Sequence, residues 1–311
     1  MNYKSNSFFE KLFKSTLKIA ALIVIGIFIL LFYSLVERSI PSLSQNGLEI
    51  LLGTSWDPNF EIFGGAPAIL GTLFSSAIAL VFALPISLCI AIFYTEYGPV
   101  RLRPFISGVM DLLAAIPSVI YGIWGLWTLS PILKINFQEP IIASIGFIPL
   151  FSGPAYGLSI FLASLILTIM ITPIISSISI DIFSKTPMPL REGMFALGAT
   201  KWEVIKNVVF PFAKRGVFAA TILGLGRALG ETMAVTMVIG NSYIWPFKSI
   251  SLFSSASTIT SKIASEFPES VVNIIHNSSL ISLALVLLLI SISINFVAEI
   301  ISKKSAGRLN V

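Results

Sequence analysis

Arg227 and Glu231 are the residues of this sequence whose types and spacing are best suited to handling an ion. They lie four residues apart in an apolar segment, GVFAATILGLGRALGETMAVTMVIG, that is long enough to cross a membrane. Four residues along a helix would place both side chains on one face, about 6 Å apart along the axis. Because an ionised side chain is costly inside a bilayer, such residues usually face a pore or a partner.

The elements that must position this pair are transmembrane helices. The chain has 311 residues, 55% of them hydrophobic and 11% charged, with a mean hydropathy of +0.92. A soluble domain carries about a quarter charged residues, so we predict an all-α polytopic membrane protein. A helix needs about 20 residues to cross the hydrocarbon core. This predicts a permease domain over 17–301, with spans at 17–36, 68–93, 105–130, 156–179, 216–240 and 279–301.

The basic residues orient the chain. Segments 1–16, 94–104, 180–215 and 302–311, together with Lys18, hold 15 of the 20 Lys and Arg residues. Since cytoplasmic loops are enriched in Lys and Arg, these segments and both termini are predicted to be cytoplasmic. Residues 1–16 either form an amphipathic helix on membrane lipid or simply orient the first span. The net charge of +5 therefore requires no nucleic acid partner.

Polar side chains elsewhere in the spans are weaker candidates for lining a path. Buried hydroxyls commonly bond the backbone of their own helix, so a structural role is the favoured interpretation for each of them. The single cysteine and the single histidine favour packing and interfacial roles, so no metal site is predicted. These hydroxyl residues are Thr72, Ser75 and Ser76 in the second span and Ser118 and Tyr121 in the third.

The longest internal loop, residues 181–215, predicts two short helices rather than a linker. The first runs from Leu190 to Leu197 and stops at Gly198, which tolerates a left-handed conformation. Thr200 followed by Glu203 is a capping box that begins a second helix, which should end near Pro211. The exposed apolar side chains either dock on another protein or pack on this chain's own membrane domain. They are Met194, Phe195, Leu197 and Trp202.

This loop resembles the EAA loop of ATP-binding-cassette (ABC) importer permeases, E-A-A-x3-G-x9-I-x-L-P. Glu192, Gly198 and Pro211 keep the spacing of its anchors. The departures, Gly193, Met194, Val208 and Phe210, are small or apolar replacements. In that family the loop docks on the ATPase subunit, so the resemblance implies a type I permease fold. It assigns Glu192 and Gly198 to an ATPase interface, on a loop that also carries Met194, Phe195, Trp202 and Pro211.

Four segments carry a more specific resemblance: LAAIPSVIYGIWGL (113–126), FSGPAYG (151–157), TKWEVIKNVVFPF (200–212) and GLGRALGETMAV (224–235). Together they resemble the PstC family, the permeases of bacterial phosphate importers. The resemblance implies phosphate transport across the inner membrane, in a complex with a PstA-like sister permease, a dimeric PstB-like ATPase and a PstS-like phosphate-binding protein. It implies no cofactor in this chain, with ATP bound by a partner. In agreement, the sequence contains no G-x-x-x-x-G-K-[ST] phosphate cradle.

With phosphate as the implied substrate, each residue of the charged pair has a task. The forked Arg227 guanidinium fits two phosphate oxygens. Glu231 would neutralise Arg227 in an empty path and would accept a hydrogen bond from a protonated phosphate oxygen. The alternative is a structural ion pair within the chain or with the sister permease. The surrounding glycines, Gly224, Gly226 and Gly230, leave the helix surface bare and are equally typical of close helix packing.

Other functions stay open on the sequence alone. The permease could carry another oxyanion, such as molybdate or sulfate. A secondary transporter with Glu231 as its proton site is a different class, but the docking loop and the six spans argue against it. A membrane scaffold with a sensory or assembly role is a third class.

Overall fold

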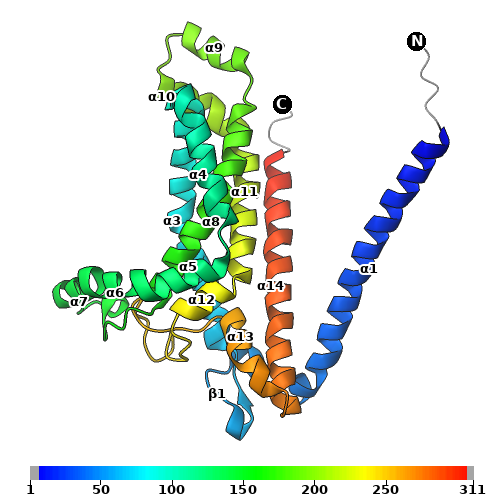
Figure 1. Ribbon diagram of the computed structural model, residues 1–311, viewed down its shortest axis with the longest axis vertical. Coiled ribbons are helices and arrows are strands. Elements are labelled where there is room, and N and C mark those ends of the chain that lie inside the picture. Colours follow the sequence, from blue (N-terminus) through cyan, green and yellow to red (C-terminus); the bar gives the residue numbers. More distant parts are fainter. Residues whose placement is uncertain (1–6, 307–311) are drawn as a thin grey trace.

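The protein, described here by a computed structural model over residues 7–306, is built almost entirely from helices (Figure 1). Within that range, six helical stretches are long and apolar enough to cross a membrane. The prediction of an all-α, six-span membrane protein is thereby confirmed. The six stretches are Glu10–Asn46, Ala66–Tyr97, Ser118–Ile145, Ile160–Ser184, Lys201–Gly230 and Ile274–Ile301.

The elements divide between a bundle and its two ends, and Figure 1 shows α9 at one end and β1 at the other. We call these the α9 end and the hairpin end. The helices are α1 (Ser7–Asn46), α2 (Glu49–Leu52), α3 (Ala66–Ile92), α4 (Arg103–Ala115), α5 (Ser118–Trp124), α6 (Ser130–Leu133), α7 (Glu139–Ile145), α8 (Ile160–Ser184), α9 (Met188–Ala196), α10 (Lys201–Val204), α11 (Phe210–Gly230), α12 (Met233–Val238), α13 (Ile259–Ser270) and α14 (Ile274–Ala306). The antiparallel strands β1 (Trp56–Asp57) and β2 (Ile62–Phe63) pair Trp56 with Phe63 and Asp57 with Ile62.

Helix α8 is the centre of the bundle. In its most apolar stretch 72% of the residues are buried, against 28% or less in the other five candidate spans. Small residues on α3 let the two backbones approach, and hydroxyls bond across the contact. The Ser87 hydroxyl donates to the Thr172 carbonyl (3.1 Å), and Thr168 donates to the Ala79 carbonyl (3.2 Å). The core therefore lies where α8 packs against α3 and α11.

Helix α1 stands apart from this core. None of its most apolar stretch is buried, and Figure 1 shows it leaning away from the bundle. Near its end it meets α14, where the Ser42 hydroxyl lies 2.8 Å from that of Ser279. The helix begins at Ser7 and is continuous, so the described part of segment 1–16 is the start of this helix rather than a separate one. The apolar surface of α1 is available to lipid or to another subunit.

The third predicted span, 105–130, is divided in the structure. Pro117 separates α4 from α5, because the residue before a proline is pushed out of the helical region, and Ile116 takes φ −64° and ψ 125°. The Tyr121 hydroxyl spans the break and donates to the Leu113 carbonyl (2.8 Å). Helices α5, α6 and α7 then continue sideways from the bundle (Figure 1).

The fifth predicted span, 216–240, differs from the observed helix at both ends. The prediction that the preceding helix ends near Pro211 is wrong, because the helical chain continues from Lys201 through Pro211 to Gly230. A π turn at Ile205–Val209 precedes the proline, and the Phe210 N–H donates to the Ile205 carbonyl five residues earlier. The wider turn shifts the hydrogen-bond ladder just where the proline lacks its N–H. At the other end the helix stops at Gly230, within the predicted span.

Candidate functional site

The break after α11 separates the two charged residues that the sequence places together. Arg227 lies in the last turn of α11 and is exposed, whereas Glu231 has left the helix with φ −69° and ψ 126° and is only 8% exposed. Among the described residues, no ion pair joins Arg227 to Glu231. The predicted neutralising pair is therefore not formed, because the four-residue spacing brings side chains together only while the helix continues.

Glu231 is held by its surroundings rather than by Arg227. Its Oε1 accepts a hydrogen bond from the Ala234 N–H at the start of α12 (3.4 Å), and its backbone carbonyl accepts one from the Thr260 hydroxyl (2.7 Å). The site thus consists of a buried glutamate and an exposed arginine on either side of a helix end. An anion that binds here would meet a guanidinium whose charge no carboxylate of the described chain pairs with.

The three glycines near this break have different surroundings. A Cβ on Gly224 would come within 2.7 Å of the Ile175 side chain on α8, so this glycine allows the two helices to pack closely. A Cβ on Gly226 or Gly230 would meet nothing within 4 Å. Packing within the chain therefore explains Gly224 alone, and the surface beside Arg227 is bare.

Three of the five hydroxyl candidates donate hydrogen bonds to nearby backbone carbonyls. Thr72 donates to the Ala68 carbonyl (2.8 Å) and accepts from the Ile259 N–H (2.9 Å), while Ser75 donates to the Thr72 carbonyl (3.2 Å). The hydroxyl of Tyr121 closes the α4–α5 break. The Ser76 hydroxyl is buried without a hydrogen-bond partner in the described chain, and Ser118 is half-buried at the first position of α5.

In the loop that resembles the EAA motif, the predicted turn and capping box form, and the first helix spans Met188–Ala196 where Leu190–Leu197 was predicted. Helix α9 is followed by Gly198 at φ +81°, whose N–H donates to the Phe195 carbonyl (2.9 Å). Thr200 and Glu203 form the predicted capping box. Two helices at the end of the molecule thus present exposed apolar side chains (Figure 1). The exposed fractions are 46% for Phe195, 83% for Leu197 and 58% for Trp202, whereas Met194 is half-buried and Glu192 is exposed.

Three contacts that the sequence analysis missed fasten this loop to the bundle. Arg191 forms an ion pair with Glu96 (3.0 Å), and these side chains are only 14% and 8% exposed. Arg191 also donates to the Phe183 carbonyl at the end of α8 (2.7 Å). Lys201 lies 4.8 Å from the centre of the Tyr97 ring. A signal was present, because Glu96 is the sole acidic residue of the basic segment 94–104.

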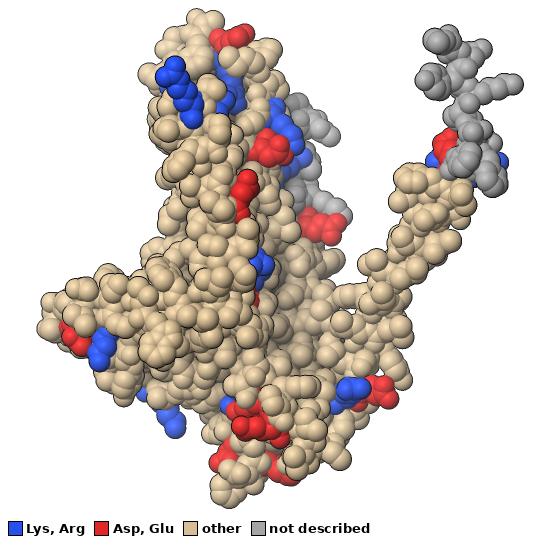
Figure 2. All heavy atoms as spheres, viewed as in Figure 1, with Lys and Arg blue, Asp and Glu red and all other residues tan. Residues whose placement is uncertain are grey.

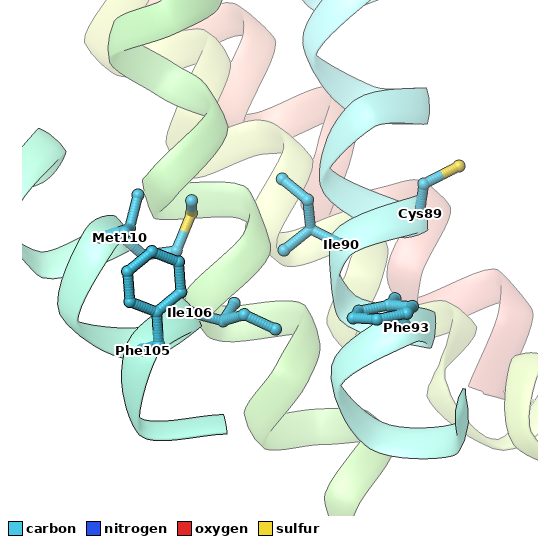
Figure 3. Close-up of a pocket in the computed structure, with 7 residues that line it drawn as sticks. Cys89, Ile90, Phe93, Phe105, Ile106 and Met110 are labelled. Carbon is cyan, nitrogen blue, oxygen red and sulfur yellow. The ribbon is translucent and has the colours of Figure 1, made fainter. Parts of the chain in front are cut away.

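An apolar groove beside the second and third spans does not suit an anion. It lies between α3 and α4, encloses about 410 Å³, and has only apolar side chains and Cys89 along it (Figure 3). Figure 2 shows charged residues gathered mainly at the two ends of the molecule, with a smaller number on the bundle between them and at the tip of the sideways arm. The groove is lined by Cys89, Ile90, Phe93, Phe105, Ile106, Val109 and Met110.

Comparison with known proteins identifies a family and relatives that match most of the chain. A family model described as "Binding-protein-dependent transport system inner membrane component" matches residues 83–307. A Haemophilus influenzae protein named phosphate transport system permease protein PstC is 42% identical over 306 residues, covering 97% of this chain and 96% of that protein. A Methanocaldococcus jannaschii protein named probable phosphate transport system permease protein PstC is 35% identical over 283 residues, covering 89% of each.

Solved structures with this fold come from ABC transporters. A chain of the bacterial alginate ABC transporter, in complex with an alginate-bound periplasmic protein, superposes with a TM-score of 0.62 at 18% identity. The match covers 94% of this chain and 98% of that one. A chain of the inward-facing MetNI methionine ABC transporter gives a TM-score of 0.55 at 18% identity, covering 76% and 94%. At these identities the likeness concerns the fold.

Proposed function

This chain belongs to the inner membrane components of binding-protein-dependent transport systems, and within them to the PstC family; from this premise we propose that it conducts inorganic phosphate as a permease subunit of an ABC importer. The observation that carries the substrate is the 42% identity, over 97% of the chain, to a relative named as a phosphate permease. The exposed docking loop at the α9 end supports coupling to a partner subunit. Because the sequence contains no nucleotide-binding cradle, we assign ATP hydrolysis to that partner.

The α9 end faces the cytoplasm in this proposal, with both termini on the same side. The basic residues support this orientation, because Lys and Arg concentrate in the segments at that end. The described ends of α1 and α14 also point toward the α9 end in Figure 1. The protein is then a multi-pass component of a bacterial inner membrane, with the hairpin end outside.

Each partner has a surface in this arrangement. A dimeric PstB-like ATPase binds and hydrolyses ATP and docks on α9 and α10, whose exposed apolar side chains include Leu197 and Trp202. A PstA-like sister permease covers the bare surface beside Gly226 and Gly230. A PstS-like phosphate-binding protein delivers phosphate at the hairpin end. This chain itself carries no cofactor and catalyses no reaction.

Arg227 is the phosphate contact in the path between the two permeases. Its guanidinium is exposed on this subunit and forms no ion pair among the described residues, so its charge is available to two phosphate oxygens. Glu231 lies beside the same helix end and accepts the hydrogen bond that only a protonated oxyanion offers. Fully ionised sulfate has no O–H to donate to this carboxylate, so it meets the negative charge of Glu231 without a compensating hydrogen bond.

The test is phosphate uptake by the purified complex in proteoliposomes. Phosphate-loaded binding protein should stimulate ATP hydrolysis and uptake, and excess sulfate or molybdate should leave phosphate uptake unchanged. Arg227→Gln should reduce uptake on the order of a hundredfold, whereas Arg101→Gln, which removes an exposed arginine of another loop, should leave it unchanged. Competition by sulfate or molybdate would assign another oxyanion, and near-normal uptake by an assembled Arg227→Gln complex would remove Arg227 from the path.

A further inference from the structure

The break at Glu231 is closed by a residue from a distant part of the chain. Thr260, in the first turn of α13, donates its hydroxyl to the Glu231 carbonyl (2.7 Å). One residue earlier, the Ile259 N–H donates to the Thr72 hydroxyl on α3 (2.9 Å). The start of α13 is therefore tied to both α3 and the end of α11, and Thr260 is buried there, at 7% exposure.

This use of a threonine hydroxyl differs from that of its neighbours. A threonine in a helix commonly bonds the carbonyl four residues earlier, as the buried Thr221 does with Val217 (2.8 Å) and the half-buried Thr236 with Thr232 (2.7 Å). Thr260 instead reaches across to another element. The carbonyl it meets lies at a helix end, where backbone groups lack partners within the helix. The contact thus satisfies a buried carbonyl and fixes the peptide that carries Glu231.

The rest of α13 is held in place, so Thr260 is attached to a fixed support. Two turns along, Glu266 accepts hydrogen bonds from the Trp56 indole N–H (2.8 Å) and lies 3.0 Å from His276 Nε2. Glu266 also pairs with Lys262, whose ammonium lies 4.4 Å from the centre of the Tyr243 ring. These contacts join α13 to the hairpin before α3 and to the start of α14.

The two charged side chains of this cluster, Lys262 and Glu266, are largely buried. Burial lowers the pKa of the Lys262 ammonium, and the opposite charge of Glu266 limits that fall. Burial, and then Glu266, raises the pKa of Tyr243, which therefore stays neutral. The cluster is thus a compact anchor in which the carboxylate of Glu266 serves partners from three segments.

We propose that Thr260 is a positioning residue for Glu231: through its hydroxyl, the anchored helix α13 sets the direction in which the Glu231 carboxylate meets phosphate. The inference rests on the proposed place of Glu231 in the phosphate path. Thr260 itself does not touch the substrate. Its hydroxyl acts on the backbone one bond from the Glu231 α-carbon, so losing it leaves the carboxylate present but free to change direction.

The experiment compares Thr260→Val with Thr260→Ser and with Thr221→Val in the full complex in proteoliposomes. Thr221→Val is the matched control, because it removes a buried hydroxyl of α11 that bonds only its own helix. The measurements are KM and maximal rate of phosphate uptake, with the thermal midpoint of the complex. Thr260→Val should raise KM about fivefold, equivalent to ~1 kcal/mol, while Thr260→Ser and Thr221→Val keep the original KM.

The split between KM and maximal rate decides the outcome. A loss of structure alone reduces the number of active complexes, so it lowers the maximal rate at constant KM, and that result overturns the proposal. An unchanged KM in Thr260→Val, or a raised KM in Thr260→Ser, overturns it as well. If Thr260→Val does not assemble, Thr260→Ala is measured by the same criterion. Failure of phosphate uptake by the unaltered complex, or normal uptake by Glu231→Gln, would instead contradict the proposed function.

Discussion

Two arginines of this chain lie in contrasting surroundings. Arg191 is mostly buried at the α9 end, 3.0 Å from Glu96, and donates to the end of α8. Arg227 is exposed in the last turn of α11 and forms no ion pair within residues 7–306. The first charge is satisfied by the fold, so it serves structure. The second is left available, which is what a site for a transported anion requires.

The largest effect should follow from removing the available charge. Arg227→Gln should reduce phosphate uptake on the order of a hundredfold, because two charge-assisted hydrogen bonds to phosphate are lost. The complex should still assemble with an unchanged thermal midpoint, since Arg227 pairs with nothing in the described fold. Uptake of radioactive phosphate and size-exclusion chromatography measure the two quantities. Normal transport by this variant would contradict a role of Arg227 in the phosphate path. Failure to assemble would show that Arg227, like Arg191, serves structure.

Removing the satisfied charge should have the opposite profile. Arg191→Met leaves the Glu96 carboxylate buried without its partner, which should destabilise the α9 end by about 3 kcal/mol. The loop should then detach from α3 and α8, and the thermal midpoint of the complex should fall. Binding-protein-stimulated ATP hydrolysis should fall with it. The control is Glu96→Gln combined with Arg191→Met, which removes both charges and should recover part of the stability.

Substitutions of the glycines beside Arg227 test whether the surface around this arginine is left free of contacts within the chain. Gly224→Ala should destabilise the isolated chain by about 1 to 3 kcal/mol, because the added methyl meets Ile175 on α8. Gly226→Ala should leave the isolated chain unchanged, since no atom lies within reach. Thermal unfolding in detergent measures both. If Gly226→Ala then weakens assembly with the sister permease, the bare surface is an interface, whereas unaltered assembly would assign it to the path alone.

The smallest effect concerns the other helix break, at Pro117. Tyr121→Phe removes the hydroxyl that bonds the Leu113 carbonyl and should lower stability by about 1 kcal/mol. The KM for phosphate should not change, because the Tyr121 hydroxyl is engaged with the chain's own backbone. The same uptake assay and thermal midpoint check both statements. A raised KM would show that the two breaks act together, contrary to the separation drawn between them.

The docking loop was predictable from the sequence because its signals are local. Gly198 reaches φ +81°, and the Thr200–Glu203 capping box forms within four residues. The error at Pro211 has a local origin too: a proline rule assumes an α-helix, and the π turn before it relaxes that constraint. The ion pair of Arg191 with Glu96 was missed because its members are 95 positions apart.

The sequence by itself determined the membrane class, the number of spans, the docking loop and the presence of two charges in an apolar segment. These follow from composition, from periodic pattern and from short-range caps, which act over a few residues. Only the tertiary structure decided that Arg227 and Glu231 do not pair. The helix stops at Gly230 where Glu231 turns away, and the break is closed by Thr260, 29 positions further along. The hydrogen bond between Thr260 and Glu231 depends on how α13 is anchored, so it could not be predicted from residue spacing within the fifth span.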